Sequence, residues 1–386
     1  MKEKIKVLVC FGTRPEGIKM APLIKEIQSN SDDMKLFICS TGQHKEMLKQ
    51  VIDFFGIKPD IELNLMTSDQ TLGKLSSKII DSMENVFNEI KPDIVLVQGD
   101  TATAFLTAFV AFYQKIKIGH VEAGLRTYNK FNPFPEEINR QLLSRITDLH
   151  FAPTENACKN LEREGFEKNS IILAGNTIVD ALKWGIKKIS DKDFLNKSEN
   201  INTLRQLIDF GKKIILVTMH RRESFGEEIK NVCEALKFIS NKYNDIEIVY
   251  PVHLNPNVAG PVNEILSGMK NIKLIKPLNY ETFLWLMSKS YFIITDSGGV
   301  QEEAPTLKKP VLVIRDFTER TESVDLGLSK LVGTKTQNII DNVSLLIESK
   351  EDYEAMITNK NPYGDGKASK RIVSAILKYF KEVNVS

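Results

Sequence analysis

The sequence predicts an α/β protein built from two Rossmann-like domains with parallel sheets. Short apolar runs alternate with longer helical stretches along most of the chain, and this alternation is typical of βαβ units. A polar stretch over residues 191–203 interrupts the alternation, which then resumes. A length of 386 residues also favours two or three domains over one hydrophobic core.

Each half of the chain contains its own series of expected strands. In the first half they begin near Ile5, Lys35, Asp93, Ile116, Leu149 and Ile171. In the second half they cover 213–218, 247–250, 273–275, 292–295 and 311–314. The intervening helices of the first half cover 15–28, 44–55, 71–90, 101–113, 136–145 and 154–164. We expect one domain over 1–176 and 366–386, with a last helix at 367–381 crossing back, and a second domain over 177–365.

Composition excludes several classes of function. The chain is 42% hydrophobic and 26% charged with a net charge of +2, so no overall field attracts nucleic acid or a membrane surface. The N-terminal apolar run is too short for a signal peptide, and the stretch 102–112 is too short for a membrane span. The cysteines are isolated, so we expect reduced thiols and a cytoplasmic protein. No histidine spacing is typical of a metal site.

Three carboxylates occupy positions that predict a common site. Asp100 follows the apolar run 94–97, Glu122 follows the run 116–118, and Glu136 comes at the start of a helix. In an open parallel sheet, ligands bind outside the carboxyl ends of the strands. We therefore expect these side chains to converge on one crevice and to transfer protons to a bound small molecule.

Cations and a histidine follow strands in a similar way. Arg14 and Lys19 lie just after the first strand, where they would either meet phosphate charge or remain solvated surface cations. Pro15 suits the first helical position. His220 follows the first strand of the second half and should face the same crevice, whereas His253 follows another strand and is a weaker candidate.

A glycine turn in the second half is the candidate anion site. Ser297-Gly298-Gly299 lies between the apolar run 292–294 and a helix start, where backbone N–H groups point towards an anion. An ordinary strand-to-helix turn is the alternative explanation. The dinucleotide fingerprint Gly-x-Gly-x-x-Gly is absent, so we expect no nicotinamide cofactor.

Taken together, these motifs resemble a known family. They are Gly12-Thr13-Arg14-Pro15-Glu16, Gln98-Gly99-Asp100-Thr101, residues 120–126, residues 135–140, Gly175-Asn176-Thr177, residues 220–224 and residues 296–303. In this order they resemble the non-hydrolysing UDP-N-acetylglucosamine 2-epimerases of bacteria and archaea, from about residue 5 to Asp365. The resemblance implies the glycosyltransferase-B fold, a homodimer, UDP-N-acetylglucosamine and UDP as ligands, and no cofactor.

The resemblance also implies roles for individual residues. The catalytic set would be Asp100, Glu122, Glu136 and His220. Substrate would be bound by Arg14, Lys19, Phe283, Ser297, Gly298, Gly299, Glu303 and Arg320. A second, activating substrate molecule would contact Gln43, Glu46, Arg221 and His253. Asp69 replaces an arginine that allosteric relatives use there, so we expect weak or absent activation. Met219 and Gly17 are two further departures from the common pattern.

The chemistry implied by the resemblance is elimination of UDP followed by its re-addition. Loss of UDP acidifies the proton on carbon 2, a carboxylate removes it, and 2-acetamidoglucal forms. Proton return to the other face gives UDP-N-acetylmannosamine for surface polysaccharide synthesis. Asp100 is the first choice as base, with Glu122 and Glu136 as opposite-face acid and orienting group. Because clustered carboxylates repel each other, at least one should have a raised pKa.

Three alternatives remain open from the sequence. A hydrolysing epimerase would release free N-acetylmannosamine, but such enzymes usually begin with Gly-Thr-Arg-Ala/Ser-Asp rather than the sequence over 12–16. A glycosyltransferase of the same fold would need no proton exchange at carbon 2. A non-catalytic sensor of nucleotide sugars would be expected to lose part of the catalytic set.

Overall fold

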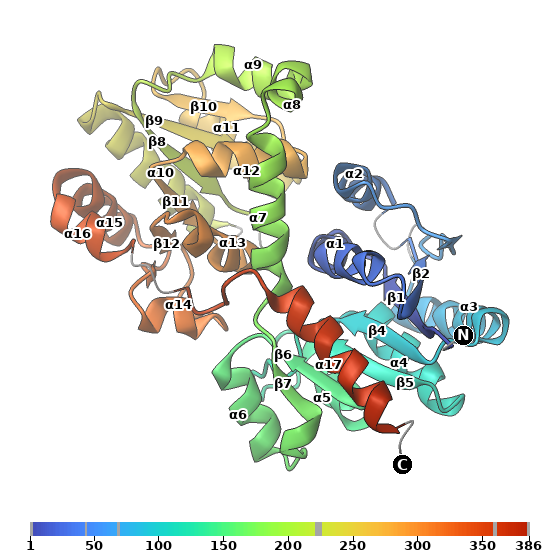
Figure 1. Ribbon diagram of the computed structural model, residues 1–386. Coiled ribbons are helices and arrows are strands. Elements are labelled where there is room, and N and C mark those ends of the chain that lie inside the picture. The colour runs from blue at the N-terminus through green and yellow to red at the C-terminus, as the bar shows by residue number, and fades with distance from the viewer. Residues whose placement is uncertain (1–2, 43–44, 68–69, 221–225, 358–360, 384–386) are drawn as a thin grey trace. The chain divides into compact units, whose positions relative to one another are not determined.

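The computed structural model describes residues 3–42, 45–67, 70–220, 226–357 and 361–383 (Figure 1). The chain divides into two compact units. Unit 1 comprises residues 1–181 and 363–386, and unit 2 comprises residues 182–362. The boundaries expected from the sequence, after residues 176 and 365, stay predictions of where independent domains divide.

Unit 1 contains, in its described part, a seven-stranded parallel sheet with the order β3-β2-β1-β4-β5-β6-β7. The strands are β1 (Ile5–Phe11), β2 (Met34–Ser40), β3 (Ile61–Glu62), β4 (Ile94–Gln98), β5 (Lys117–Val121), β6 (Leu149–Ala152) and β7 (Ile171–Leu173). The order reverses at β1, which lies between β2 and β4. Such a reversal places the crevice for a ligand at the carboxyl ends of the neighbouring strands.

Helices cover both faces of this sheet (Figure 1). They are α1 (Arg14–Ser29), α2 (Lys45–Phe55), α3 (Leu72–Ile90), α4 (Ala102–Tyr113), α5 (Glu136–Ile146), α6 (Glu155–Arg163), the start of α7 (Thr177–Ile189) and α17 (Ala368–Val383). Helix α4 packs between α3 and α5, and their apolar side chains form one core with Leu8, Cys10 and Val97 of the sheet. Helix α17 packs against α1, so the end of the chain belongs to unit 1.

Unit 2 contains, as far as it is described, a six-stranded parallel sheet with the order β10-β9-β8-β11-β12-β13. Its strands are β8 (Lys213–Thr218), β9 (Ile246–Pro251), β10 (Ile272–Ile275), β11 (Phe292–Thr295), β12 (Val311–Val313) and β13 (Ser329–Leu331). The order again reverses at the first strand, β8. The two units therefore repeat one topology, and each has its own reversal point.

The helices of unit 2 begin with α8 (Lys192–Lys197) and α9 (Glu199–Leu207). They continue with α10 (Glu227–Lys242), α11 (Pro256–Leu266), α12 (Tyr280–Lys289), α13 (Gly298–Glu303), α14 (Thr321–Asp325), α15 (Thr336–Glu348) and α16 (Lys350–Ala355). Helix α10 packs between α11 and α15 over one face of the sheet. Met219 is 2% exposed and belongs to this core, which accounts for an apolar residue before His220.

The predicted fold class is confirmed, with local differences. Strands β3 and β13 were not expected, because they span two and three residues and are too short to show a pattern. The polar stretch 191–203 forms helices α8 and α9, capped by Asp191 and Ser198. At Gly17, an added Cβ would lie 2.6 Å from the Leu48 side chain, so the glycine allows α2 to pack closely on α1.

The four cysteines are unpaired, as expected, and Cys10 and Cys39 face each other as neighbours in β1 and β2. None of the helices in the described part of the chain has the length and apolar character needed to cross a membrane.

Candidate active site

The site in unit 1 begins at the junction of β1 and α1. The Thr13 hydroxyl accepts a hydrogen bond from the Glu16 N–H, and the Glu16 carboxylate accepts one from the Thr13 N–H at 2.7 Å. This reciprocal capping box fixes the first turn of α1. The helix begins at Arg14, so Pro15 occupies the second helical position and not the first, as the sequence had suggested. Its missing N–H still costs no helical hydrogen bond there.

Lys19 lies further along α1 and forms a buried ion pair with Glu122. The Lys19 Nζ donates to the Glu122 carboxylate, and the two side chains are 9% and 7% exposed. Glu122 follows β5 with φ of 68°, a left-handed conformation that residues other than glycine rarely adopt. Backbone held in this conformation is typical of functional sites, where the surrounding structure compensates for the strain.

Asp100 lies in the turn after β4 and is held by α5. Its carboxylate accepts hydrogen bonds from Arg140, at 2.8 Å from Nε and 2.6 Å from Nη2. The Asn139 side chain donates to the Asp100 backbone carbonyl at 2.8 Å. The Asp100 side chain is 26% exposed, so it is fixed in place and still reachable by a ligand. Arg140 had no predicted role, although it lies within the motif over residues 135–140.

Glu136 lies close to this carboxylate. Its own burial, and then the negative charge of Asp100, raise the pKa of Glu136 above its ordinary value of 4.5, while Arg140 acts in the opposite direction. The direction agrees with the expectation of a raised pKa in the cluster, although burial contributes more than the charge repulsion on which that expectation was based. A carboxyl group in these surroundings holds its proton to higher pH and can serve as an acid.

The next residue, Glu137, has a structural role. Its buried carboxylate accepts hydrogen bonds from the N–H groups of Thr127 and Tyr128 at 3.0 and 3.1 Å, and from the Gln141 side chain at 2.8 Å. Burial has the largest single effect on the pKa of Glu137 and by itself would raise it. The hydrogen bonds and the charge of Arg140 nevertheless outweigh it and lower the pKa of Glu137. Glu137 therefore remains charged and fixes the loop before α5.

His120 supports the turn before Asp100 from within the sheet. Burial lowers the pKa of His120 to about 3, so the ring is neutral. Its Nε2 lies 2.7 Å from the Gly99 carbonyl, which can only accept a hydrogen bond, so Nε2 carries the proton. Gly99 has φ of 73°, which suits glycine. His120 thus holds the backbone on the N-terminal side of Asp100.

Unit 2 places His220 beside a buried carboxylate. The His220 N–H donates to Asp296 Oδ2 at 2.8 Å, and the ring Nδ1 lies 3.1 Å from Oδ1. Asp296 follows β11 and is fully buried, whereas the His220 side chain is 46% exposed. The ring of His253 stacks on that of His220 at 6.3 Å between centroids. The Nδ1 side of the imidazole therefore faces Asp296, and the side chain as a whole remains partly exposed.

Arg320 lies against the glycine turn after β11. Its Nε donates to Glu302 at 2.9 Å and its Nη1 donates to Glu319 at 2.7 Å. A Cβ added at Gly298 would lie 3.3 Å from the Arg320 Cζ, tighter than most real Cβ contacts. Gly298 is therefore the residue that lets the guanidinium approach the backbone of the turn.

The other predicted ligands of unit 2 surround this turn or lie on α12. Ser297 is partly buried, and its N–H donates to the Thr295 hydroxyl at 2.9 Å. Gly299 is exposed, Glu303 is 7% exposed, and Phe283 on α12 is partly buried. In unit 1, Arg14 is partly buried as well. The arrangement offers backbone N–H groups and a buried carboxylate to a polar ligand.

Most of the predicted activator site lies outside the described residues. This applies to Gln43, Arg221 and Asp69, and the side chain of Glu46 is not described either. His253 is described and contacts His220. Weak or absent activation stays a prediction.

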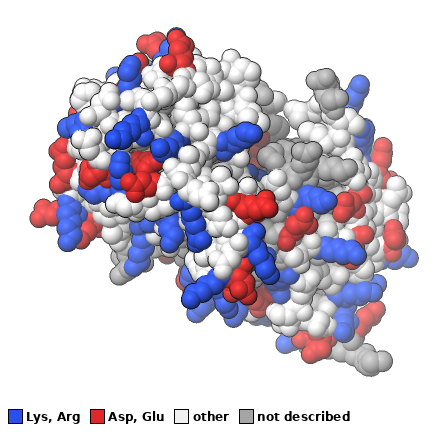
Figure 2. Space-filling model, turned by 90° about the horizontal axis from the view of Figure 1, so that it is seen from above, with Lys and Arg blue, Asp and Glu red and all other residues white. Residues whose placement is uncertain are grey.

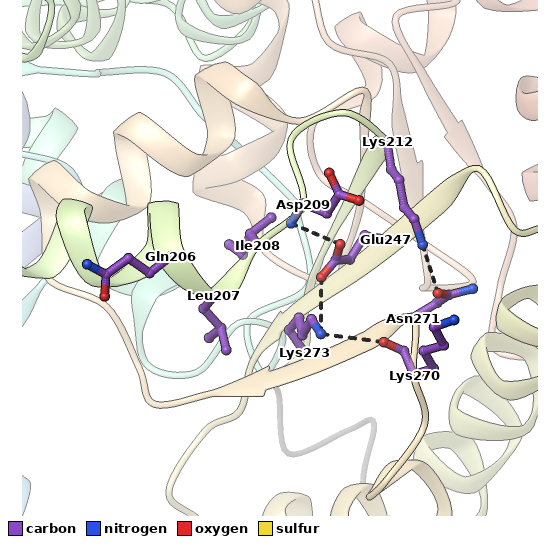
Figure 3. A pocket seen from close by; sticks show the side chains of 9 residues that line it. All are labelled: Gln206, Leu207, Ile208, Asp209, Lys212, Glu247, Lys270, Asn271 and Lys273. Carbon is purple, nitrogen blue, oxygen red and sulfur yellow. Dashed lines mark hydrogen bonds and ion pairs between the residues drawn. The ribbon is translucent and has the colours of Figure 1, made fainter.

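A cavity of about 280 Å³ lies at the opposite edge of the unit 2 sheet, near the amino ends of β8, β9 and β10 (Figure 3). It is lined by Gln206, Leu207, Ile208, Asp209, Lys212, Glu247, Lys270, Asn271 and Lys273. Lys212 donates to Asn271 at 2.9 Å, and Lys273 pairs with the buried Glu247 at 3.5 Å. Several of the polar groups that line this cavity are therefore paired with one another.

Charged side chains of both signs are mixed on one face of the molecule (Figure 2). On the face shown in Figure 2, basic and acidic side chains are interspersed and do not form one large region of a single sign. This distribution agrees with the net charge of +2. Among the residues that the structure describes, no group of three or more His, Cys, Asp and Glu side chains could hold a metal ion.

Comparison with known proteins decides the family. The family model described as UDP-N-acetylglucosamine 2-epimerase matches residues 25–377. The chain belongs to this family. A UDP-N-acetylglucosamine 2-epimerase of Campylobacter jejuni is 54% identical over 374 residues, which cover 97% of each chain. The relatives carry the name of an isomerase, so the assignment of the chain to an isomerase family is confirmed.

Solved structures agree on the fold. The epimerase of Neisseria meningitidis bound to UDP-GlcNAc is 48% identical and has a TM-score of 0.90, covering 97% of this chain and 100% of that one. A glycosyltransferase from Rickettsia africae is 13% identical with a TM-score of 0.60, covering 99% of each chain, and supports the fold alone. The predicted glycosyltransferase-B-like class is confirmed.

Proposed function

We propose that this chain interconverts UDP-N-acetylglucosamine and UDP-N-acetylmannosamine without net hydrolysis. The observation that carries the proposal is the set of charged groups at the carboxyl ends of β4 and β5, formed by Asp100 with Arg140, Glu136, and Glu122 with Lys19. Membership of the epimerase family supports the substrate, as does the UDP-GlcNAc bound in the Neisseria relative.

The reaction proceeds by elimination and re-addition. The bond between carbon 1 and the UDP oxygen breaks with its electron pair leaving on UDP, and a base removes the proton from carbon 2. A double bond forms between carbons 1 and 2, giving 2-acetamidoglucal. An acid then protonates the opposite face of carbon 2, and the UDP oxygen adds back to carbon 1. Two faces require two proton-transfer groups, which a cluster of carboxyl groups can supply.

The surroundings of each carboxyl group support a division of roles. Asp100 is the base, because its carboxylate is held by Arg140 and remains reachable. Glu136 is the acid, because burial and the charge of Asp100 raise its pKa. Glu122 is buried in its pair with Lys19 and orients the sugar.

Within unit 2, residues around the glycine turn after β11 and on α12 bind the nucleotide. Gly298 and Gly299 offer backbone N–H groups to the diphosphate, with Arg320 beside the turn. Ser297, whose N–H bonds to the Thr295 hydroxyl, offers its side-chain hydroxyl. Glu303 holds the ribose hydroxyls, and Phe283 lies beside the uracil. His220, oriented by Asp296, assists departure of UDP. Arg14 contributes charge to phosphate binding.

A homodimer is the proposed assembly, through an apolar face of unit 1. Phe112 and Tyr113 at the end of α4 are 53% and 69% exposed, and Leu142 on the adjacent α5 is 46% exposed. The ring of Phe109 lies 4.5 Å from that of Tyr113 between centroids, so the aromatic surface is continuous along α4. In a symmetric dimer, α4 and α5 of a second copy would cover this apolar surface with the same apolar side chains. We further propose a cytoplasmic enzyme whose product supplies surface polysaccharide synthesis.

The test is identification of the products by proton and phosphorus NMR. The purified chain incubated with UDP-N-acetylglucosamine should give UDP-N-acetylmannosamine at a constant ratio and no accumulating UDP. Accumulation of UDP with free N-acetylmannosamine would identify a hydrolysing enzyme instead. Unchanged substrate, with and without added UDP, would contradict the proposal.

A further inference from the structure

The carboxylate of Glu16 has more hydrogen-bond donors around it than a helix cap requires. Its Oε2 accepts from the Gly12 N–H at 3.1 Å and from both the N–H and the hydroxyl of Thr13 at 2.7 Å. Its Oε1 accepts from the Thr101 hydroxyl at 2.7 Å. The residue is 1% exposed, and the bonds to Gly12 and Thr13 are buried, whereas the bond to Thr101 is partly buried.

The bond to Thr101 connects two segments that are far apart in the sequence. Thr101 directly follows Asp100 and is the N-cap residue of α4, where its hydroxyl oxygen accepts from the Ala104 N–H at 3.0 Å. The hydroxyl hydrogen is therefore directed to Glu16. One carboxylate consequently ties the start of α1, which carries Arg14, to the turn that carries Asp100.

Burying the charged Glu16 carboxylate is energetically unfavourable unless the four hydrogen bonds compensate for the lost solvation. Burial raises the pKa of Glu16, and the hydrogen bonds from Thr101, Thr13 and Gly12 act against that rise. Every group facing the carboxylate is a donor, so the charged form, which only accepts, suits the position. With glutamine at position 16, the NH₂ group of the side-chain amide would face at least one of these donors, and that hydrogen bond could not form.

A cap alone does not account for these contacts. Helix α3 is capped by Thr71, whose hydroxyl accepts from the Lys74 N–H at 3.3 Å, without a buried glutamate. Helix α4 is capped by Thr101 in the same way. In α1 the capping box uses Oε2, whereas Oε1 bonds to a different helix.

We propose that Glu16 is a positioning residue that holds the Asp100 turn in register with the start of α1 through Thr101. The inference rests on the proposed epimerisation, because it assigns Asp100 as the base. Glu16 touches no reacting atom. Its contribution is to keep Asp100 in place for proton abstraction, where a displacement of about 1 Å costs of order a hundredfold in rate.

The test compares Thr101→Val with two matched variants. Thr101→Val removes the hydroxyl that bonds to Glu16 and also the cap of α4. Thr71→Val removes a cap of the same type from α3, and Thr101→Ser retains the hydroxyl. Steady-state kcat and KM are measured together with amide hydrogen exchange over residues 11–17 and 98–104.

We expect Thr101→Val to lower kcat about tenfold with KM changed less than about twofold, since substrate binding groups are intact. Exchange at the Thr13 amide, which donates to Glu16, should rise in this variant. Thr71→Val and Thr101→Ser should stay within about twofold of the wild type.

Equal kcat losses in Thr101→Val and Thr71→Val would overturn the inference and leave the proposed function intact. If the wild-type chain does not epimerise the substrate, the proposed function fails. The inference would then be decided by amide hydrogen exchange alone. An unchanged exchange rate at the Thr13 amide in Thr101→Val would refute the link between the two segments.

Discussion

The two units place an aspartate at the same topological position but bury it to different degrees. Asp100 follows β4 of unit 1, is 26% exposed and is held by Arg140. Asp296 follows β11 of unit 2, is fully buried and itself holds His220. Both strands lie beside the first strand of their unit, where the strand order reverses.

This difference indicates how the same topology can provide both an accessible carboxylate and a buried one. A carboxylate that a ligand can reach is suited to proton transfer, whereas a buried one is suited to orienting a neighbour. The first two residues of α5 show the same contrast, because Glu136 is partly buried with a raised pKa and Glu137 is buried with a lowered pKa. The predictions below separate the reacting groups from the orienting ones, beginning with the largest effect.

Asp100→Asn should lower kcat by roughly a thousandfold, because the amide cannot accept the proton from carbon 2. Its size and most of its hydrogen bonds are kept, so stability should change little. The matched control is Asp148→Asn, which alters an ion-paired aspartate at the start of β6, on the opposite edge of the same sheet. Similar activity in the two variants would remove Asp100 from the mechanism.

Glu136→Gln and Glu137→Gln should separate activity from stability. Glu136→Gln should lower kcat by about a hundredfold and leave the unfolding free energy nearly unchanged. Glu137→Gln should lower the unfolding free energy by about 1–3 kcal/mol, because buried N–H groups of Thr127 and Tyr128 lose charged acceptors. Denaturant titration and kinetics on both variants provide the comparison, and a reversed pattern would exchange their roles.

The pH dependence follows from the raised pKa of Glu136. The acid must be protonated, so kcat should fall as pH rises through this pKa, which lies above 4.5. The stability that the protonated group contributes is present at low pH and is lost over the same rise. A kcat profile of wild type and Glu136→Gln should differ in this alkaline limb, and identical limbs would contradict the assignment.

Asp296→Asn should lower kcat about tenfold, less than Asp100→Asn, because His220 remains and loses only its charged partner. Affinity for UDP, measured by calorimetry, should change less than kcat. Asp341→Asn, on the exposed face of α15 in the same unit, is the control and should stay within about twofold. An effect of Asp296→Asn equal to that of the control would separate Asp296 from catalysis.

Gly298→Ala should produce the smallest effect, an increase of about threefold in KM with kcat retained. The added Cβ would lie 3.3 Å from the Arg320 Cζ, so the guanidinium must shift by a few tenths of an ångström. Gly260→Ala in α11 is the control, since a Cβ there meets nothing within 4 Å. Unchanged KM in Gly298→Ala would remove Arg320 from nucleotide binding.

The fold could be predicted from the sequence because alternation of apolar strands and helices is a local signal. It indicated both sheets, and it failed at β3 and β13 because such short strands carry no periodicity. Strand-end positions also pointed to Asp100 and Glu122 in unit 1 and to His220 in unit 2, since the carboxyl ends of parallel strands within one sheet share one edge.

The partners of these residues could not be predicted in the same way. Asp100 pairs with Arg140, 40 residues later, and His220 pairs with Asp296, 76 residues later. Such pairs depend on how the elements pack and leave no local pattern. Glu16 is the exception, because the spacing Thr-x-x-Glu at 13–16 is a helix-start signal that could have been recognised, although its bond to Thr101 could not.

The most direct test of proton transfer at carbon 2 is proton NMR of wild type and Asp100→Asn with UDP-N-acetylglucosamine in heavy water. We expect the wild type to place deuterium at carbon 2 of both epimers, because the proton is removed and returned from solvent. Asp100→Asn should incorporate it roughly a thousandfold more slowly. Formation of UDP-N-acetylmannosamine without deuterium at carbon 2 would contradict the mechanism.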